Sequence, residues 1–111
     1  MGKYIQPVTF TGRGFQTLVR SGGWKVCFSR YSENASAVMK RHLETDEVFI
    51  LLEGSAMLYV EDESVPMERC TLYNVKKGLW HRAVLSEDAA VLVVENSDTT
   101  AENTEMRCET C

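Results

Sequence analysis

Short runs of apolar residues, or of apolar residues alternating with polar ones, recur along most of the chain. Turn residues separate these runs at intervals of roughly eight to twelve residues, which is typical of a β-sandwich or β-barrel. No window of about a dozen residues keeps the apolar period of an amphipathic helix. The pattern therefore predicts an all-β fold with little or no helix. The expected strands cover residues 8–10, 15–19, 24–31, 37–42, 47–52, 56–60, 70–75, 81–85 and 90–95.

Individual segments refine this expectation. The run 47–52 is apolar on both faces, so we expect a central strand that is covered on both sides. A turn at Gly54 returns it into the next run and makes a hairpin. The acidic segment 61–64 is predicted to be a charged loop. Cys27 lies in an apolar run and is predicted to be a small core residue.

The apolar pattern ends near residue 96. Residues 97–111 are polar and are predicted to be a solvated tail, which leaves residues 1–96 as a single domain. The tail ends in the motif Cys108-Glu109-Thr110-Cys111, whose simplest interpretation is a loose pair of incidental thiols. Metal scavenging, an intermolecular disulfide and a redox role are the alternatives. A redox motif would normally lie at a helix N-terminus, which lowers a thiol pKa.

Composition narrows the classes of partner. The 111 residues suffice for one domain with a core but not for two domains. A net charge of −4 offers no basic surface for nucleic acid or for an anionic membrane. The longest apolar run is too short to cross a bilayer, and the first residues contain no apolar signal segment. We therefore expect a cytoplasmic protein with reduced cysteines that binds neither nucleic acid nor membrane.

Two histidines and one glutamate are the candidate metal ligands. A short loop between His42 and Glu47 can turn both side chains toward one point, and His81 begins another strand soon after a glycine turn. A closed or double-sheet β fold brings such strand starts together at one mouth. Two imidazoles and one carboxylate suit a divalent ion such as Zn, Fe, Mn or Ni. Each residue alone is compatible with a surface or hydrogen-bonded side chain, and only the joint pattern favours a metal.

The spacing His42-x4-Glu47-x6-Gly54 resembles the second half of the first motif of the cupin superfamily, and Gly78-x2-His81 resembles the centre of the second motif. The separation of the two blocks is typical of small single-domain cupins, and the resemblance covers roughly residues 37–96. It implies an RmlC-like jelly-roll barrel, or double-stranded β-helix, with the metal ligands at its mouth. It also implies a homodimer.

The chain departs from the cupin pattern at three positions. Lys40 stands where cupins have a first histidine, Lys76 where they usually have a proline, and Leu85 where an asparagine is expected. Lys40 shares strand parity with His42, so it is expected to point into the barrel. One interpretation is that its ammonium replaces the missing ligand and pairs with Glu47, leaving no metal. The other is that it lies beside a three-ligand metal as a catalytic proton donor or an anion clamp.

Aromatic residues are the candidate substrate contacts. Tyr59 and Trp80 are predicted to bind substrate, although Trp80 also suits packing at the mouth or in a dimer interface. The residues Tyr73-Asn74-x3-Gly78-x-Trp80-His81 resemble the corresponding segment of ureidoglycolate lyases. This local resemblance implies a lyase that acts on a small polar acid.

The sequence thus predicts a small cupin-type protein that binds a divalent metal at the barrel mouth and acts on a small polar or anionic metabolite. Lyase, isomerase and oxygenase chemistry all remain open, because cupins carry many reactions on one fold. The first alternative is a non-catalytic module that binds or senses a small molecule, with Lys40 replacing a metal ligand. The second is a structural scaffold with a vestigial site.

Overall fold

A computed structural model describes residues 4–33, 38–97, 99 and 103–108, and the described part contains ten strands and no α-helix. Among these residues, none belongs to a helix long and apolar enough to cross a membrane. The all-β prediction is therefore confirmed. The strands are β1 Gly14–Ser21, β2 Trp24–Arg30, β3 Val38–His42, β4 Glu47–Glu53, β5 Ala56–Val60, β6 Glu63–Pro66, β7 Leu72–Val75, β8 His81–Leu85, β9 Ala90–Asn96 and β10 Thr104–Cys108.

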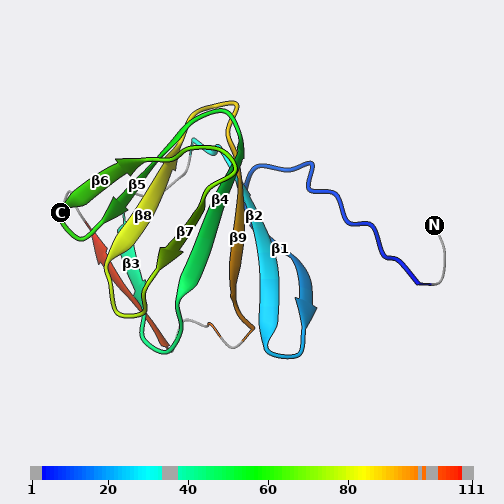
Figure 1. Cartoon of the computed structure of the whole chain (residues 1–111), viewed down its shortest axis with the longest axis horizontal. Helices are drawn as coiled ribbons and strands as arrows, with labels where there is room; N and C mark the ends of the chain where they lie inside the picture. Colours follow the sequence, from blue (N-terminus) through cyan, green and yellow to red (C-terminus); the bar gives the residue numbers. More distant parts are fainter. Residues whose placement is uncertain (1–3, 34–37, 98, 100–102, 109–111) are drawn as a thin grey trace.

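The strands form two antiparallel sheets that face each other (Figure 1). One sheet has the order β1-β2-β9-β4-β7, and the other has the order β10-β3-β8-β5-β6. Strands distant in the sequence are therefore neighbours, as in a jelly roll. The core lies between the sheets, since its buried side chains come from the facing sides of both. It consists of Cys27, Phe49, Leu51, Ala56, Leu58, Met67, Val75, Val91 and Val93.

Three segments differ from the sequence prediction. Residues 8–10 form no strand. The apolar side chain of Phe10 packs against the Phe28 ring instead, with 5.5 Å between the ring centroids. The charged loop expected at 61–64 is shorter, since β6 begins at Glu63 and pairs with β5. Strand β4 is not covered on both sides, because Phe49 is buried whereas Leu52 is 42% exposed.

The polar tail prediction is wrong for Thr104–Cys108, which forms β10 and pairs antiparallel with β3. Strand β10 is the edge strand of its sheet, and Met106 is 67% exposed. An edge strand with such an exposed side chain needs no apolar period, so residues 104–108 carry no hydrophobic signal of a strand. The last residues of the predicted thiol motif, 109–111, lie outside the described residues, so its interpretation stays a prediction.

Gly54 makes the turn between β4 and β5, and the hairpin predicted there is wrong, because the two strands lie in different sheets and do not pair with each other. Gly54 has a φ of 70°, and a Cβ placed there would lie 2.6 Å from the Cα of Ala89. Only glycine accepts both the left-handed backbone and this close approach without strain. The turn carries the chain from the sheet that holds Glu47 to the sheet that holds His81.

Candidate metal centre

A row of three charged side chains crosses the first sheet on its core-facing side. Lys25 on β2 is the register partner of Glu95 on β9, and Glu95 is the register partner of Glu47 on β4. All three are buried, with exposed fractions of 7%, 7% and 5%. Two residues along each strand, the next row on the same face is apolar and belongs to the core: Cys27, Val93 and Phe49. The charged row therefore forms the polar end of the core.

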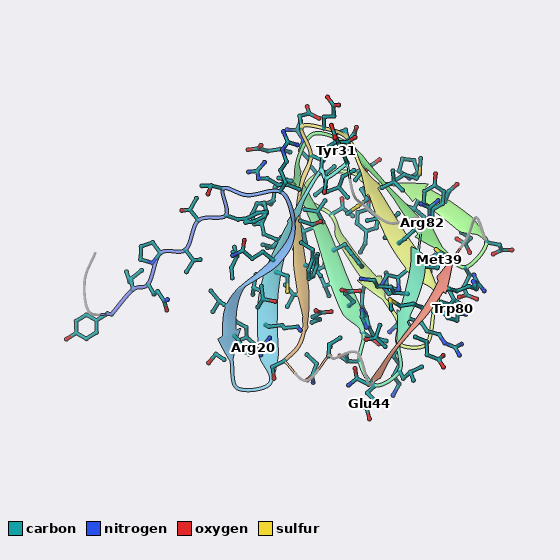
Figure 2. The ribbon with its side chains drawn as sticks, turned by 180° about the vertical axis from the view of Figure 1, so that it is seen from behind. Arg20, Tyr31, Met39, Glu44, Trp80 and Arg82 are labelled. Carbon is teal, nitrogen blue, oxygen red and sulfur yellow. The ribbon has the colours of Figure 1, made fainter. Side chains whose placement is uncertain are left out.

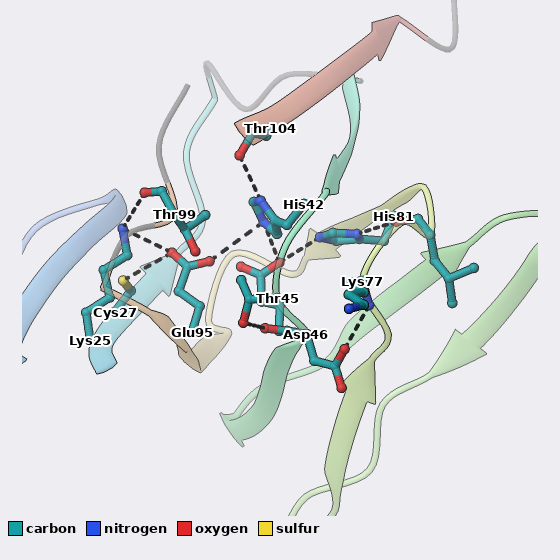
Figure 3. A network of polar contacts seen from close by, with 12 residues as sticks. Lys25, Cys27, His42, Thr45, Asp46, Lys77, His81, Glu95, Thr99 and Thr104 are labelled. Carbon is teal, nitrogen blue, oxygen red and sulfur yellow. Dashed lines mark hydrogen bonds and ion pairs between the residues drawn. The ribbon is translucent and has the colours of Figure 1, made fainter. Parts of the chain in front are cut away.

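Two histidines approach this row from the opposite sheet (Figure 3). His42 ends β3 and His81 begins β8, and both are buried, as predicted for strand termini that meet at one mouth. The Nε2 atoms of His42 and His81 lie 3.0 Å and 2.7 Å from Oε1 of Glu47. One ligand atom from each residue lies within 4.8 Å of the others, so the three predicted ligands converge.

The Nδ1 atoms of both histidines make contacts on the side of the ring away from Glu47. Nδ1 of His81 donates to the carbonyl oxygen of Leu79 at 3.0 Å, and Nδ1 of His42 lies 2.9 Å from the hydroxyl of Thr104. A carbonyl only accepts, so the proton on Nδ1 of His81 is fixed and Nε2 faces the site. Contacts of this kind orient metal-binding histidines in proteins.

The loops that carry the ligands are tied together by Asp46. Its carboxylate accepts hydrogen bonds from the backbone N–H of Lys77 at 2.9 Å and from the side-chain amide of Asn74 at 3.2 Å. The backbone N–H of Gly78 donates to the carbonyl of His42 at 2.7 Å. The bond from Lys77 is the main cause of a lowered pKa of Asp46. These bonds fix the loop after β3 to the turn before β8, so the two histidines keep their separation.

The charges of the centre are strongly coupled. Burial opposes ionisation of Glu47, but hydrogen bonds from His42 and His81 outweigh burial and hold the pKa of Glu47 well below its usual range. Burial likewise disfavours charged His81, yet its hydrogen bond to Glu47 and the charge of Glu47 raise its pKa. In the metal-free protein the site therefore holds an ionised Glu47 beside His81, which takes up a proton more readily than a free histidine.

Glu95 is part of this centre, and the sequence analysis missed it. Its Oε2 atom lies 3.6 Å from Nε2 of His42, and its Oε1 atom lies 3.4 Å from Nζ of Lys25. Burial, together with the hydrogen bond and the charge of Glu47, raises the pKa of Glu95 to about 7. A signal was present in the sequence, because Glu95 shares strand parity with the core residues Val91 and Val93.

The other candidate site residues lie apart from the ligands. Lys40 is exposed, although it stands opposite His81 in the register of β3 and β8. This exposure does not favour the interpretation in which Lys40 pairs with Glu47, whose carboxylate instead bonds two histidines. Its assigned role as a proton donor or anion clamp stays a prediction.

The two aromatic candidates belong to stacks with arginine. Tyr59 has the opposite strand parity to the core residue Leu58, and the Arg82 guanidinium lies 4.8 Å from its ring centroid. Trp80 lies between the guanidinium groups of Arg41 and Arg107, each 4.6 Å from its ring centroid. Figure 2 shows Trp80 beside β10, far from the β1–β2 hairpin that carries Arg20. Substrate contact by Tyr59 or Trp80 stays a prediction.

No protein-family model and no curated protein sequence matches the chain. Solved structures do match. A cupin-2 domain protein of Shewanella frigidimarina superposes with a TM-score of 0.64 at 19% identity, over 78% of this chain and 84% of that one. An RmlC-like cupin of Methanocaldococcus jannaschii with a double-stranded β-helix fold gives a TM-score of 0.67 at 13% identity, over 86% and 93%.

The chain has the cupin fold. A further cupin-like neighbour is a variant of Streptomyces PAC13 solved with uridine, with a TM-score of 0.67 at 15% identity, over 97% of this chain and 93% of that one. The jelly-roll prediction is therefore confirmed. At these identities the likeness concerns the fold, so the chemistry of this chain has to be argued from its own side chains.

Proposed function

We propose that this cupin binds a divalent metal ion through Nε2 of His42, the carboxylate of Glu47 and Nε2 of His81. The observation that carries the proposal is the convergence of three buried ligand atoms within 4.8 Å of one another. The donor set fits a dication, because two imidazoles and a carboxylate suit Zn, Fe, Mn or Ni. The hydrogen bonds to Nδ1 of both histidines leave the Nε2 atoms directed at a common point.

A small pocket on the described surface supports a small polar ligand. Its lining side chains are all polar, and Thr45 among them lies two residues before Glu47 in the chain. Its lining consists of Glu44, Thr45, Asn96, Thr99 and Asn103. A metal with three protein ligands keeps open positions, where it acts as a Lewis acid on a bound oxygen. Exposed Lys40 is the candidate to orient an anionic group or donate a proton.

A metal-free binding function is the second candidate. It is favoured by the hydrogen bonds of Glu47, which already satisfy both histidines without an ion. In this case the polar pocket and the centre would bind a small neutral or anionic molecule without turnover. The uridine named with the PAC13 structure makes a nucleoside a reasonable first probe.

Metal analysis of matched variants tests the first candidate. The parent for this experiment carries Cys108→Ser and Cys111→Ser, so that terminal thiols cannot supply the signal. Glu47→Ala removes the central carboxylate, whereas Glu53→Ala removes an exposed carboxylate from the same strand β4. We expect near-stoichiometric metal in the parent and in Glu53→Ala, and its loss from Glu47→Ala.

A parent that stays metal-free after dialysis against Zn²⁺, Mn²⁺, Ni²⁺ and anaerobic Fe²⁺ would refute the metal site. If uridine, a neutral nucleoside, or a small anion then raised the melting temperature of the metal-free parent, the second candidate would be supported. Circular dichroism of each variant separates loss of metal from loss of fold.

A further inference from the structure

The geometry points to Glu95 as a fourth ligand of the proposed metal, held in place by Lys25. This inference rests on the proposed metal site and extends it to a donor set of two histidines and two glutamates. The sequence position where cupins supply a first histidine is occupied by Lys40, whose ammonium has no lone pair to donate. Glu95 would supply the missing donor from the opposite sheet.

One oxygen of ionised Glu95 lacks a hydrogen-bond donor. Oε2 of Glu95 is buried and accepts no hydrogen bond from the described residues, whereas protonated Glu95 can donate to Glu47. Buried carboxylate oxygens without a partner are rare, because removing them from water costs free energy that nothing returns. Oε2 lies 3.6 Å from Nε2 of His42, the atom that the proposal assigns to the metal. The oxygen therefore faces the place where a cation would sit.

The Glu95 carboxylate is held so that Oε2 points toward the centre. Its other oxygen, Oε1, lies 3.4 Å from Nζ of Lys25, and the thiol of Cys27 is 3.9 Å from the same atom. Lys25 is itself fixed by donating to the carbonyl of Thr99 at 3.1 Å. Figure 3 shows Glu95 between Lys25 on one side and His42 on the other. Lys25 is therefore a positioning residue that leaves Oε2 directed at the centre.

Two carboxylates are adjacent at the centre. Glu95 and Glu47 are register partners on β9 and β4, so their side chains project side by side from the same face. Like charges placed opposite each other destabilise a sheet, and more so when they are buried. Without a metal, a proton on Glu95 offsets this repulsion, and a dication bound by both carboxylates would replace that proton. With two carboxylates in the donor set, hard ions such as Mn²⁺ or Fe²⁺ are favoured over Zn²⁺ relative to a three-histidine site.

Titration of the purified chain with Mn²⁺ and Co²⁺ tests the inference, with Cys108→Ser and Cys111→Ser in every protein. Glu95→Gln keeps the shape of the side chain but removes its charge and most of its strength as a ligand. We expect it to weaken Mn²⁺ binding, measured by calorimetry, by more than about 100-fold, because loss of a ligand should exceed the roughly 10- to 100-fold loss known for residues that support ligands from behind. Glu53→Gln, which removes an exposed carboxylate from β4, controls for charge and should change affinity less than about threefold.

The visible spectrum of bound Co²⁺ supplies a second readout, because its bands move when an oxygen donor leaves the metal. A changed Co²⁺ spectrum in Glu95→Gln, together with weaker Mn²⁺ binding, supports ligation. An affinity within about threefold of the parent overturns it, and so does weaker binding with an unchanged spectrum, which would indicate a charge effect alone. If Glu95→Gln fails to fold, Glu95→Asp is judged by the same two readouts.

The outcome for the proposed function is distinguishable. If the parent binds no metal, the proposed function fails and Glu95 has no ligand role. If the parent binds metal, His81→Ala loses it and Glu95→Gln keeps both affinity and spectrum, then the three-residue site stands and only the inference about Glu95 is wrong.

Discussion

Replacing Glu95 by glutamine should stabilise the metal-free protein at alkaline pH. Burial and the neighbouring Glu47 raise the pKa of Glu95 from 4.5 to about 7. The folded protein therefore holds a proton on Glu95 that the unfolded chain releases above its ordinary pKa. Stability from this group is complete at low pH and is lost as the pH rises through about 7. Glutamine stays neutral and cannot lose this stability.

The magnitude follows from the rise in pKa. A change from 4.5 to about 7 corresponds to at most about 3 kcal/mol, and partial solvent screening reduces it to about 2 kcal/mol. At pH 8 the Glu95→Gln variant should therefore exceed the parent in free energy of unfolding by ~2 kcal/mol. At pH 5 the two proteins should be nearly equal. The raised pKa of His81 acts in the same direction, so the variant keeps part of the pH dependence.

Urea denaturation followed by circular dichroism, in a strong chelator and at several pH values, measures this effect. Glu53→Gln, an exposed carboxylate change on β4, is the matched control and should follow the parent at every pH. The reasoning is refuted if Glu95→Gln is no more stable than the parent at pH 8, or if both lose stability equally between pH 5 and 8.

Three further changes test the fold and the support of the centre. Gly54→Ala should lower the free energy of unfolding by about 3 kcal/mol, because the new Cβ would clash with the Ala89 backbone and the residue would keep a strained positive φ. Gly78→Ala has no atom near its Cβ and should lower it by only about 1 kcal/mol. Equal losses of stability in urea denaturation would contradict this reasoning. Leu58→Ala should lower the free energy of unfolding by roughly 2 to 5 kcal/mol in the same measurement, because it leaves a cavity in the core. Leu72→Ala, at a side chain that is 60% exposed, should change it by no more than about 0.5 kcal/mol. Thr104→Val should weaken metal binding by roughly tenfold or more in calorimetry by releasing Nδ1 of His42, and an unchanged affinity would show that this contact is dispensable.

The sequence predicts a strand well where apolar and polar side chains alternate and the apolar ones are buried. Strand β9 alternates buried Val91, Val93 and Glu95 with half-buried neighbours, and its run was recognised without ambiguity. Strand β6 was missed because its first residues, Glu63 and Ser64, are exposed and polar. Strand β10 was missed for the same reason. Both are edge strands, whose pairing is decided by the neighbouring strand and not by their own hydrophobicity.

The ligands could be predicted because two of them share one local spacing and the third follows a glycine turn. Glu95 and Lys25 could not, because their part in the centre depends on register across three strands. The alternation in β2 points to the wrong face, because the apolar side chains of Val26 and Phe28 are only half-buried whereas the buried face carries Lys25 and Cys27. A single sequence shows that a strand alternates but does not say which face meets the core.

Burying the row of charged side chains costs desolvation free energy, which argues for a role other than stability. Lys25, Glu95 and Glu47 occupy adjacent core-facing positions that apolar side chains could fill, and buried ion pairs are often no more stabilising than such replacements. The row also leaves Oε2 of ionised Glu95 without a hydrogen-bond donor among the described residues. The histidines that complete the cluster come from the other sheet, so the polar groups do not stabilise one sheet alone. A dication would account together for the two adjacent carboxylates, for the direction of Oε2 and for the orientation of both imidazoles, whereas the metal-free network needs a proton on Glu95 to hold the two carboxyl groups side by side.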